Sequence, residues 1–300
     1  MVDRKVVQLV PFEKLAELDS ENISYELLPS LVVFSVKSDG RKKQRLVACG
    51  NFSASDETDD TYAGTVSALG WRLLVTIFSQ ARGAIACADV CEAFTQSRFA
   101  PGESRKTRTF LRPPSAWKEK LLPELFKQFQ VEPGTVPKVL IEVLTSIYGE
   151  RSAPRRWAET LNRVLVQHGF QRCKYEDSTW TRYNPSTGSI TIVSIYVDDV
   201  WAFGLDSAEV WAVMELVNSE FRTTPIQWLC GAPDWLWNPE DPRAQLCERP
   251  DGSPRWAVPN TLERALSYIG TQVYFQGEPG SETLILSQQD FIRKSLQKIE

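Results

Sequence analysis

Residues 189–204 read SITIVSIYVDDVWAFG, two apolar runs that are interrupted by a short acidic break at Asp198 and Asp199. Runs rich in β-branched and aromatic residues predict strands, and a break of about two residues predicts a tight antiparallel hairpin. Two adjacent carboxylates repel each other, which raises the pKa of one of them unless a cation neutralises the charge. The sequence therefore predicts a sheet with two acidic side chains at a hairpin tip.

A third carboxylate follows a similar apolar run. Asp89 ends the stretch IACAD, which predicts a short buried strand. If this strand lies next to the hairpin, the side chains of Asp89, Asp198 and Asp199 converge, and carboxylate oxygens are ligands that Mg²⁺ takes in proteins. Two such ions about 4 Å apart can activate an attacking hydroxyl and stabilise a leaving phosphate. The alternative reading of Asp198 and Asp199 is a polar turn without a ligand.

The order of the predicted elements indicates the fold class. Between Ile85 and Phe221 the pattern gives strand, helix, hairpin and helix. This order is typical of an α+β fold in which a split β-α-β antiparallel sheet carries its helices on one face. Upstream, residues 21–53 predict strands around a turn at Asp39 and Gly40. The Pro- and Trp-rich stretch 230–256 predicts a long insertion.

Three segments have helical periodicity: residues 67–83, 152–169 and 206–221. The apolar face that we expect for the first comprises Leu69, Leu73, Ile77 and Phe78. The stripe that we expect for the second comprises Trp157, Leu161, Val164 and Leu165. The second helix should end at Gly169 as its C-cap, and the third should begin after an N-cap at Asp206 or Ser207.

The chain has a single histidine, His168, and this excludes several kinds of chemistry. A zinc site of the H-E-x-x-H type needs two histidines, and a Ser-His-Asp triad would have to use His168 itself. Because His168 extends the apolar stripe of the second helix by one turn, we expect it to pack at the helix end.

The net charge of −4 and the pI of about 5.4 argue against a generally basic surface for nucleic acid. Residues 41–45 nevertheless read RKKQR, a local group of cations that suits phosphate. The alternative is a solvated surface. No apolar run approaches the roughly 18 residues of a membrane span, and the N-terminal stretch carries charges where a secretory signal is apolar. We therefore expect an intracellular protein that does not cross a membrane.

Six stretches resemble, in order, the motifs of one known family. They read KQRLVACGNF, ADVCEAF, SIYGERSAPRRW, YVDD, YIGTQV and LSQQDFIRKSL. They are similar to K-A-R-L-V-A-R-G-F, D-V-K-x-A-F, S-L-Y-G-L-K-Q-A-P-R-x-W, Y-x-D-D, F-L-G-I-E-V and L-S-Q-x-K-Y-I-x-D-L-L of the reverse transcriptases of copia-type long-terminal-repeat retrotransposons. The resemblance runs from about Lys43 to Lys298 and is specific because of the number and order of the motifs.

The resemblance implies an RNA-directed DNA polymerase that adds dNTPs to a primer 3′-hydroxyl. The catalytic residues would be Asp89, Asp198 and Asp199, which would bind two Mg²⁺ ions, with Mn²⁺ as an alternative metal. The backbone carbonyl of Val90 would be a further metal ligand.

The resemblance also implies contacts with the incoming nucleotide. Arg45 would reach the triphosphate, since a guanidinium fork suits phosphate oxygens, and Lys43 is a weaker candidate for the same contact. Phe94 would be the steric gate that excludes a ribose 2′-hydroxyl, although an aromatic core residue is the alternative reading. The other implied nucleotide contacts are Tyr148, Gly149, where a glycine permits close backbone approach, and Tyr196.

Primer and template contacts are expected in two places, the first from the local positive charge and the second from the resemblance. Arg151, Arg155 and Arg156 would bind phosphates at the start of the 152–169 helix, where cations oppose the helix dipole and a phosphate contact offsets that cost. The primer grip would comprise Tyr268, Ile269 and Gly270.

A right-hand polymerase architecture, with fingers and a palm, follows from the same resemblance. The expected domains are a lead-in segment at 1–24, part of the fingers at 25–84, a palm at 85–224 with an interleaved fingers segment at about 101–155, the insertion at 225–262, and a primer-grip hairpin with the start of a thumb at 263–300.

The implied partners are an RNA or DNA template with its primer, dNTPs, and the RNase H and integrase parts of a polyprotein, in a cytoplasmic particle or the nucleus. The sequence departs from the family at Cys49, Ser152 and Thr224, where Arg, Gln and Lys are usual. Two alternatives stay open: a decayed or domesticated nucleic-acid-binding remnant, and an unrelated Mg²⁺-dependent phosphotransferase. The second would need a phosphate loop, and no G-x-x-x-x-G-K-[ST] occurs.

Overall fold

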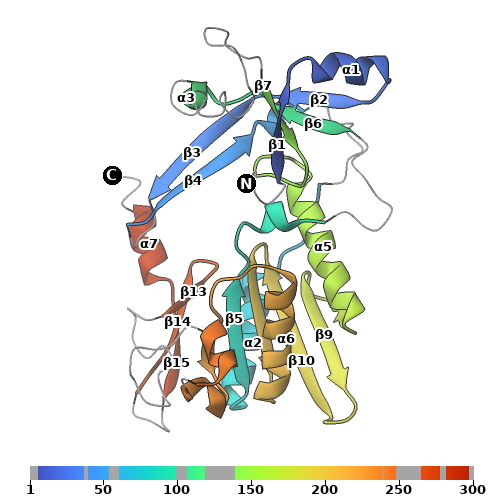
Figure 1. Cartoon of the computed structure of the whole chain (residues 1–300). Helices are drawn as coiled ribbons and strands as arrows, with labels where there is room; N and C mark the ends of the chain where they lie inside the picture. The colour runs from blue at the N-terminus through green and yellow to red at the C-terminus, as the bar shows by residue number, and fades with distance from the viewer. Residues whose placement is uncertain are drawn as a thin grey trace. The chain divides into compact units, whose positions relative to one another are not determined.

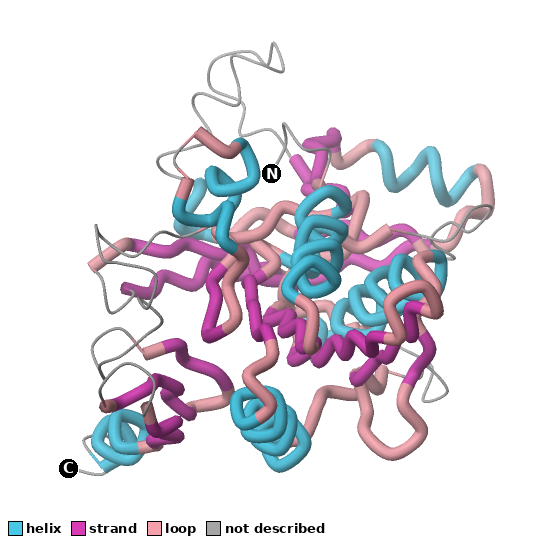
Figure 2. Tube along the Cα trace, turned by 90° about the horizontal axis from the view of Figure 1, so that it is seen from below, coloured by secondary structure: helices cyan, strands magenta, loops and turns pink. Residues whose placement is uncertain are grey.

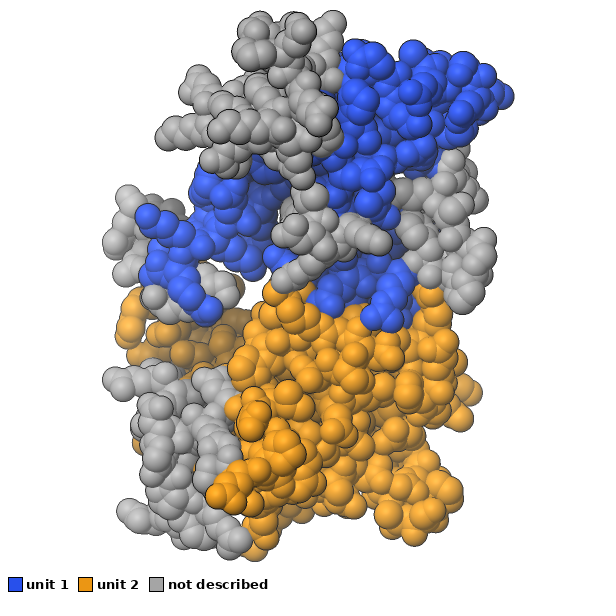
Figure 3. All heavy atoms as spheres, in the orientation of Figure 1, with its two compact units in different colours: residues 1–63, 92–162 blue, residues 64–91, 163–300 orange. Residues whose placement is uncertain are grey.

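The structure is a computed structural model, and two compact units make up the chain (Figure 3). It describes residues 6–36, 40–53, 61–98, 107–118, 139–238, 240–247, 265–277 and 282–296. Unit 1 comprises Met1–Ala63 and Glu92–Asn162, and unit 2 comprises Gly64–Cys91 and Arg163–Glu300. Each unit thus combines segments that are distant in sequence.

Unit 1 contains a four-stranded sheet in the order β1–β7–β6–β2, whose only parallel described pair is β2 with β6. Its elements are β1 (Val7–Pro11), α1 (Lys14–Ser20), β2 (Tyr25–Leu28), β6 (Arg108–Leu111), α3 (Ser115–Lys118) and β7 (Val139–Val143). Phe110 and Leu111 are adjacent on β6, yet they belong to two different buried clusters. Both faces of the sheet are therefore covered. The segment expected as a lead-in, 1–24, contains β1 and α1.

A two-stranded hairpin completes unit 1. Strands β3 (Ser30–Val36) and β4 (Lys42–Ala48) pair antiparallel, as the sequence predicts around Gly40. Gly40 has φ +80°, a left-handed conformation that glycine adopts without strain. The far end of the hairpin presents apolar side chains to solvent, with Phe34 and Val36 about 70% exposed.

Unit 2 is built on a six-stranded sheet that is antiparallel throughout, in the order β12–β5–β11–β10–β9–β8. The strands are β5 (Ala84–Asp89), β8 (Gln171–Arg172), β9 (Thr179–Asn184), β10 (Ser189–Tyr196), β11 (Asp199–Gly204) and β12 (Gln227–Cys230). The sequence predictions of a buried strand ending at Asp89 and of a hairpin around Asp198 are confirmed. Strand β12, at one edge, lies within the stretch expected as an insertion.

The two faces of this sheet are covered by different elements (Figure 1). Helix α6 (Ser207–Glu220) covers one face, where a Cβ on Gly204 would lie 3.0 Å from the Cγ2 atom of Val210. Helix α2 (Ala68–Gln80) covers the other, where its Trp71 shares a buried cluster with Trp201. The expectation of helices on one face only is therefore wrong. The sheet is apolar on both sides, so both sides must be shielded from water.

Helix α2 packs through a face that differs from the predicted one. Of the predicted face only Phe78 is buried, and it packs together with Trp71 and Val75. Leu69, Leu73 and Ile77 are exposed. The helix carries two apolar stripes at helical spacing, and periodicity alone does not decide which of them faces the core. The stripe with the two large aromatic rings is buried because it removes more apolar surface from water.

A three-stranded sheet packs on the same face as α2. Its strands are β13 (Leu266–Tyr268), β14 (Thr271–Gln276) and β15 (Thr283–Ser287), and α7 (Gln289–Leu296) lies beside them near the C-terminus (Figure 2). Leu266, Tyr268 and Val273 join the cluster that contains Trp71 and Trp201. This sheet therefore belongs to the core of unit 2.

Helix α5 (Ala153–Gln167) confirms the second helical prediction, since Trp157, Leu161 and Leu165 are buried. His168 follows the helix and is exposed, so the expectation that it packs at the helix end is wrong. The remaining short elements are η2 (Gly50–Phe52), η3 (Ala93–Gln96), η4 (Asp234–Trp237) and η5 (Pro242–Leu246). Among the described helices, none combines the length and the apolar character that crossing a bilayer requires.

Candidate active site

The tip of the β10–β11 hairpin carries the adjacent aspartates. Tyr196 pairs with Asp199, so the turn between the strands consists of Val197 and Asp198. Val197 has φ +57°, a conformation that β-branched residues rarely adopt. Such backbone strain persists only where the surrounding structure enforces it, and it is common at functional sites. The hairpin thus holds Asp198 at its turn and Asp199 at the first position of β11.

The register of the sheet brings Asp89 to the same place. Asp89 and Asp199 are direct partners across β5 and β11, so their side chains leave the same face of the sheet. The predicted juxtaposition of these two carboxylates on neighbouring strands is confirmed. The described residues contain no group of three or more His, Cys, Asp or Glu side chains already arranged around a common metal position. A metal ion shared by Asp89, Asp198 and Asp199 therefore stays a prediction.

Backbone hydrogen bonds hold Asp89 in position on its other side. Its N–H donates to the Oγ1 atom of Thr224 at 3.0 Å, and the N–H of Thr224 donates to the carbonyl oxygen of Asp89 at 2.8 Å. The next residue, Val90, donates its N–H to the carbonyl oxygen of Asp198 at 2.8 Å, and its side chain is fully buried. These bonds join the end of β5 to the hairpin tip. The role of the Val90 carbonyl as a metal ligand stays a prediction.

The electrostatics of the site favour a bound cation. Burial, together with the neighbouring charges of Asp198 and Asp89, raises the pKa of Asp199 to about 7. Ionising Asp199 therefore costs free energy, because it adds a charge to a partly buried group of carboxylates. A divalent cation bound to these oxygens would remove that cost. The donor set, which consists of carboxylates, is the one that Mg²⁺ or Mn²⁺ prefers.

An aromatic layer lies on the same face as the aspartates. The ring of Tyr268 lies 4.6 Å from that of Trp71, 5.1 Å from that of Trp201 and 6.1 Å from that of Tyr196, measured between centroids. Tyr268 is 1% exposed, so its side chain is a core element and the expectation that it contacts the primer directly is corrected. The cause is tertiary: the three-stranded sheet docks through this ring.

The other two residues of the expected primer grip form the turn between β13 and β14. Ile269 has φ +47° and Gly270 has φ +69°. A Cβ on Gly270 would lie 2.9 Å from the ring of Phe291 on α7, so this glycine is needed for close packing of the helix. The turn itself stays the candidate for a primer contact.

Unit 1 gathers three of the residues that the resemblance assigns to the nucleotide. The guanidinium carbon of Arg45 lies 5.2 Å from the centre of the Tyr148 ring, a cation–π contact. The ring of Tyr148 lies 5.1 Å from that of Phe94. Lys43 is two residues before Arg45 on β4, so both side chains leave the same face of the strand. Three distant sequence positions thus form one aromatic and cationic group.

Gly149 has a structural role that the sequence does not reveal. It has φ +89°, and a Cβ there would collide with the carbonyl oxygen of Ala48. The N–H of Ala48 donates to the carbonyl oxygen of Tyr148 at 2.8 Å. The close backbone approach at Gly149 is to strand β4, and the contact of Gly149 with the nucleotide stays a prediction.

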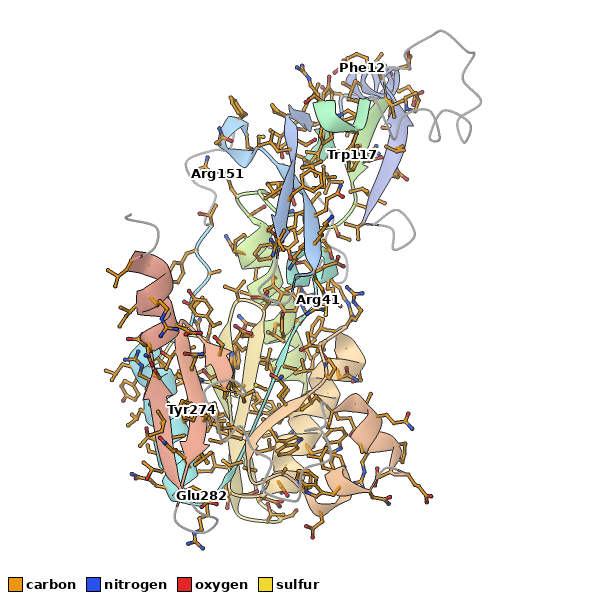
Figure 4. The ribbon with its side chains drawn as sticks, turned by 90° about the vertical axis from the view of Figure 1, so that its left-hand side faces the viewer. Phe12, Arg41, Trp117, Arg151, Tyr274 and Glu282 are labelled. Atoms are coloured by element: carbon orange, nitrogen blue, oxygen red, sulfur yellow. The ribbon has the colours of Figure 1, made fainter. Side chains whose placement is uncertain are left out.

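The arginines at the start of α5 have acidic neighbours. Arg155 donates to Glu159, one turn along the helix, at 2.7 Å. Arg156 lies 3.8 Å from the carboxylate of Glu150, which is buried and accepts a hydrogen bond from the N–H of Ile147 at 2.8 Å. Arg151 is exposed (Figure 4). A phosphate that binds here would have to compete with these carboxylates, a cost that charge counting does not show.

Sequence reasoning missed three residues of this site. Thr224 was noted only as a departure from the family, and its hydrogen bonds to Asp89 depend on a contact between distant segments. Ser194 and Trp201 were assigned to strands without a further role, yet both face the aspartate side of the sheet. A signal was present for Ser194, because a serine within the apolar run TIVSIY breaks the pattern of a buried strand.

Comparison with known proteins agrees with the motifs. A family model described as reverse transcriptase (RNA-dependent DNA polymerase) matches residues 24–229. A search of curated proteins gives no match. The matched range includes Asp89, Asp198 and Asp199, and it contains the whole six-stranded sheet to within one residue of the end of β12.

Proposed function

Because the chain belongs to the reverse transcriptase (RNA-dependent DNA polymerase) family, we propose that it extends a primer on a nucleic-acid template with dNTPs, as the polymerase of a copia-type retrotransposon. The matching family is typical of copia-type long-terminal-repeat elements. The observation that carries the proposal is the pairing of Asp89 with Asp199 beside a hairpin turn that contains Asp198. This is the arrangement that a metal-dependent nucleotidyl transfer requires.

The three aspartates would hold divalent cations, Mg²⁺ or Mn²⁺. When bound, these ions supply Lewis-acid activation of the primer 3′-hydroxyl and neutralise charge on the phosphates of the dNTP. The protein contributes rigidity. Asp89 is held by Thr224 on one side and by β11 on the other, and Asp198 is fixed by its carbonyl contact with Val90. Rigid ligands lose less entropy when the site forms.

Arg45 would bind the triphosphate of the incoming nucleotide. Its contact with Tyr148 restricts the guanidinium, and this preorganisation favours a bidentate phosphate contact. Phe94, packed against Tyr148, would stand beneath the sugar and exclude a 2′-hydroxyl. Primer and template would be bound through Arg151, Arg155 and Arg156 and through the turn at Ile269 and Gly270.

The test is extension of a labelled primer on an RNA and on a DNA template by the purified chain with Mg²⁺. We expect template-dependent addition of dNTPs, and loss of at least a hundredfold in rate for Asp198→Asn. Asp177→Asn is the matched control, because Asp177 forms an exposed ion pair with Arg172 and the substitution is chemically the same. Extension by the Asp198→Asn variant at the parent rate would contradict the proposed site.

A second function has one observation in its favour. Threonine stands at position 224, where the family usually has a lysine, and this departure suits a nucleic-acid-binding remnant that no longer turns over. The same assay separates the two functions: a chain that binds primer–template but extends no primer with Mg²⁺ or Mn²⁺ would be the remnant.

A further inference from the structure

Two rows of side chains cross the aspartate face of the six-stranded sheet. Cross-strand pairing aligns Tyr196, Asp199 and Asp89 in the first row. It aligns Ser194, Trp201 and Cys87 in the second. Because pairing partners and residues two apart on a strand share a face, all six side chains leave the same side of the sheet.

Tyr268 covers both rows. Its ring contacts Trp201 in the second row and Tyr196 in the first, and it packs on Trp71 of α2 from the other side. Tyr268 comes from β13, so it is the point at which the three-stranded sheet meets the aspartate face. A ring held by three aromatic neighbours has little rotational freedom, so the direction of its O–H bond is also restricted.

The phenol hydroxyl is buried beside the hydroxyl of Ser194, whose interaction lowers the pKa of the phenol. Within the described residues, neither hydroxyl has a partner at standard hydrogen-bond geometry, so their contact is a poor hydrogen bond. Tyr268 contacts the ring of Tyr196, the cross-strand partner of Asp199, so the phenol lies on the aspartate side of the sheet. In agreement with this placement, burial and then the charge of Asp199 raise the pKa of the phenol. Leaving a buried donor without a good acceptor costs free energy, so such a group needs an explanation, for example a bound ion or a functional role.

We propose that Tyr268 is a positioning residue for the metal site, whose phenol O–H donates a hydrogen bond to the ionised carboxylate of Asp199 and orients it for metal binding. The hydroxyl of Ser194 lies next to this bond and can donate to the phenol oxygen in turn. This inference rests on the proposed metal-binding role of Asp199, and it adds a coupling between the β13–β14 turn and the catalytic aspartates. Mutating a residue that contacts a metal ligand, but not the metal itself, commonly lowers metal affinity by 10- to 100-fold.

The coupling follows from connectivity. Tyr268 directly precedes the turn at Ile269 and Gly270, which is the candidate primer contact. A displacement of that turn would therefore move the phenol relative to Asp199. In this way the position of the primer would change the orientation of the Asp199 carboxylate.

The experiment measures Mn²⁺ binding to the full chain by electron paramagnetic resonance, without nucleic acid. We expect Tyr268→Phe, which removes one oxygen and keeps the ring, to weaken Mn²⁺ affinity about tenfold. Tyr274→Phe is the matched control, because Tyr274 lies on β14 of the same sheet and neighbours the buried Val273, so it faces away from the aspartates (Figure 4). Its Mn²⁺ affinity should equal that of the parent.

A structural role alone would not produce this pattern. At pH 5 without metal, Asp199 is protonated and offers the phenol O–H no charged acceptor, so Tyr268→Phe should unfold at the same or a higher urea concentration than the parent. In primer extension, its half-saturating Mg²⁺ concentration should rise about tenfold while the KM for dNTP stays unchanged.

Three results would overturn the inference: equal Mn²⁺ affinity in the parent and Tyr268→Phe, an equal loss in Tyr274→Phe, or no Mn²⁺ binding by the parent. The proposed polymerase function fails separately. If Tyr268→Phe weakens Mn²⁺ binding but the parent extends no primer, the positioning role stands and the catalytic proposal does not.

Discussion

Replacing Asp199 by asparagine should stabilise the metal-free protein at pH 8 and change its stability little at pH 4. In the folded protein the pKa of Asp199 is raised to about 7 from the ordinary value of 3.8, because the carboxyl is partly buried next to two other carboxylates. A raised pKa means that the folded state holds the proton more tightly than the unfolded state. The protonated carboxyl therefore contributes its full stability below about pH 4, and this contribution is lost as the pH rises through about 7.

The magnitude follows from the displacement of the pKa. A shift of roughly three pH units at 1.36 kcal/mol per unit corresponds to about 4 kcal/mol. The side chain is partly exposed, and solvent screening reduces this to about 2 kcal/mol. Asparagine has a similar shape and no charge, so Asp199→Asn should recover about 2 kcal/mol of unfolding free energy at pH 8.

The assay is urea unfolding followed by tryptophan fluorescence, in EDTA, at pH 4.5 and pH 8. Trp201 lies two residues along β11 from the substitution and reports on this part of unit 2. Asp177→Asn is the control and should show no pH-dependent gain. With saturating Mg²⁺ the order should reverse at pH 8, because only the parent keeps all three carboxylates. A variant no more stable than the parent at pH 8 in EDTA would refute the electrostatic reasoning.

Four further outcomes are expected. Thr224→Val should destabilise the chain by about 1–3 kcal/mol and lower extension activity, because the Asp89 N–H loses its acceptor. Thr224→Ser should behave as the parent, and equal melting curves for the two variants would contradict this expectation. Gly149→Ala should lower the free energy of unfolding by more than about 2 kcal/mol, since a positive φ is combined with a collision at Ala48. Gly188 has φ +69° with open space around it, so Gly188→Ala should lower it by only about 1 kcal/mol when both variants are compared by thermal unfolding. Phe94→Ala in an active enzyme should incorporate ribonucleotides far better than the parent in single-nucleotide extension, and unchanged sugar selectivity would return Phe94 to a packing role. Arg155→Ala/Arg156→Ala should weaken primer–template binding. The slope of log binding constant against log salt concentration should become shallower by about 0.7 per lost contact on single strands, and an unchanged slope would mark both arginines as surface residues.

Local sequence patterns predicted the elements that carry the chemistry. The hairpin around Asp198, the strand that ends at Asp89 and the helix that contains Trp157 all follow from spacing that a single segment contains. These predictions hold because strand and helix periods are properties of the backbone, and each segment has one apolar pattern that suits one of them. The motifs predicted the family for the same reason, since each motif lies within one segment.

Predictions that depend on which partner covers a surface were the ones that failed. Helix α2 has two apolar stripes, and only the approach of β5 and β11 decides that Trp71 is buried and Leu69 is not. His168 continues an apolar stripe, yet its side chain is exposed, because no described segment buries it at the end of α5. Neither outcome can be read from the segment itself, because burial is a relation between segments.

The sequence by itself determined that two strands would present carboxylates at their ends, because alternation and the acidic break are local. Only the tertiary structure decided that Asp89 pairs with Asp199, that Thr224 holds the backbone of Asp89, and that Tyr268 is buried beneath the hairpin tip. Register, docking and desolvation arise when distant segments meet. The free energies that fix them, from hydrogen bonds between strands to the packing of aromatic rings, belong to those contacts and to no single stretch of sequence.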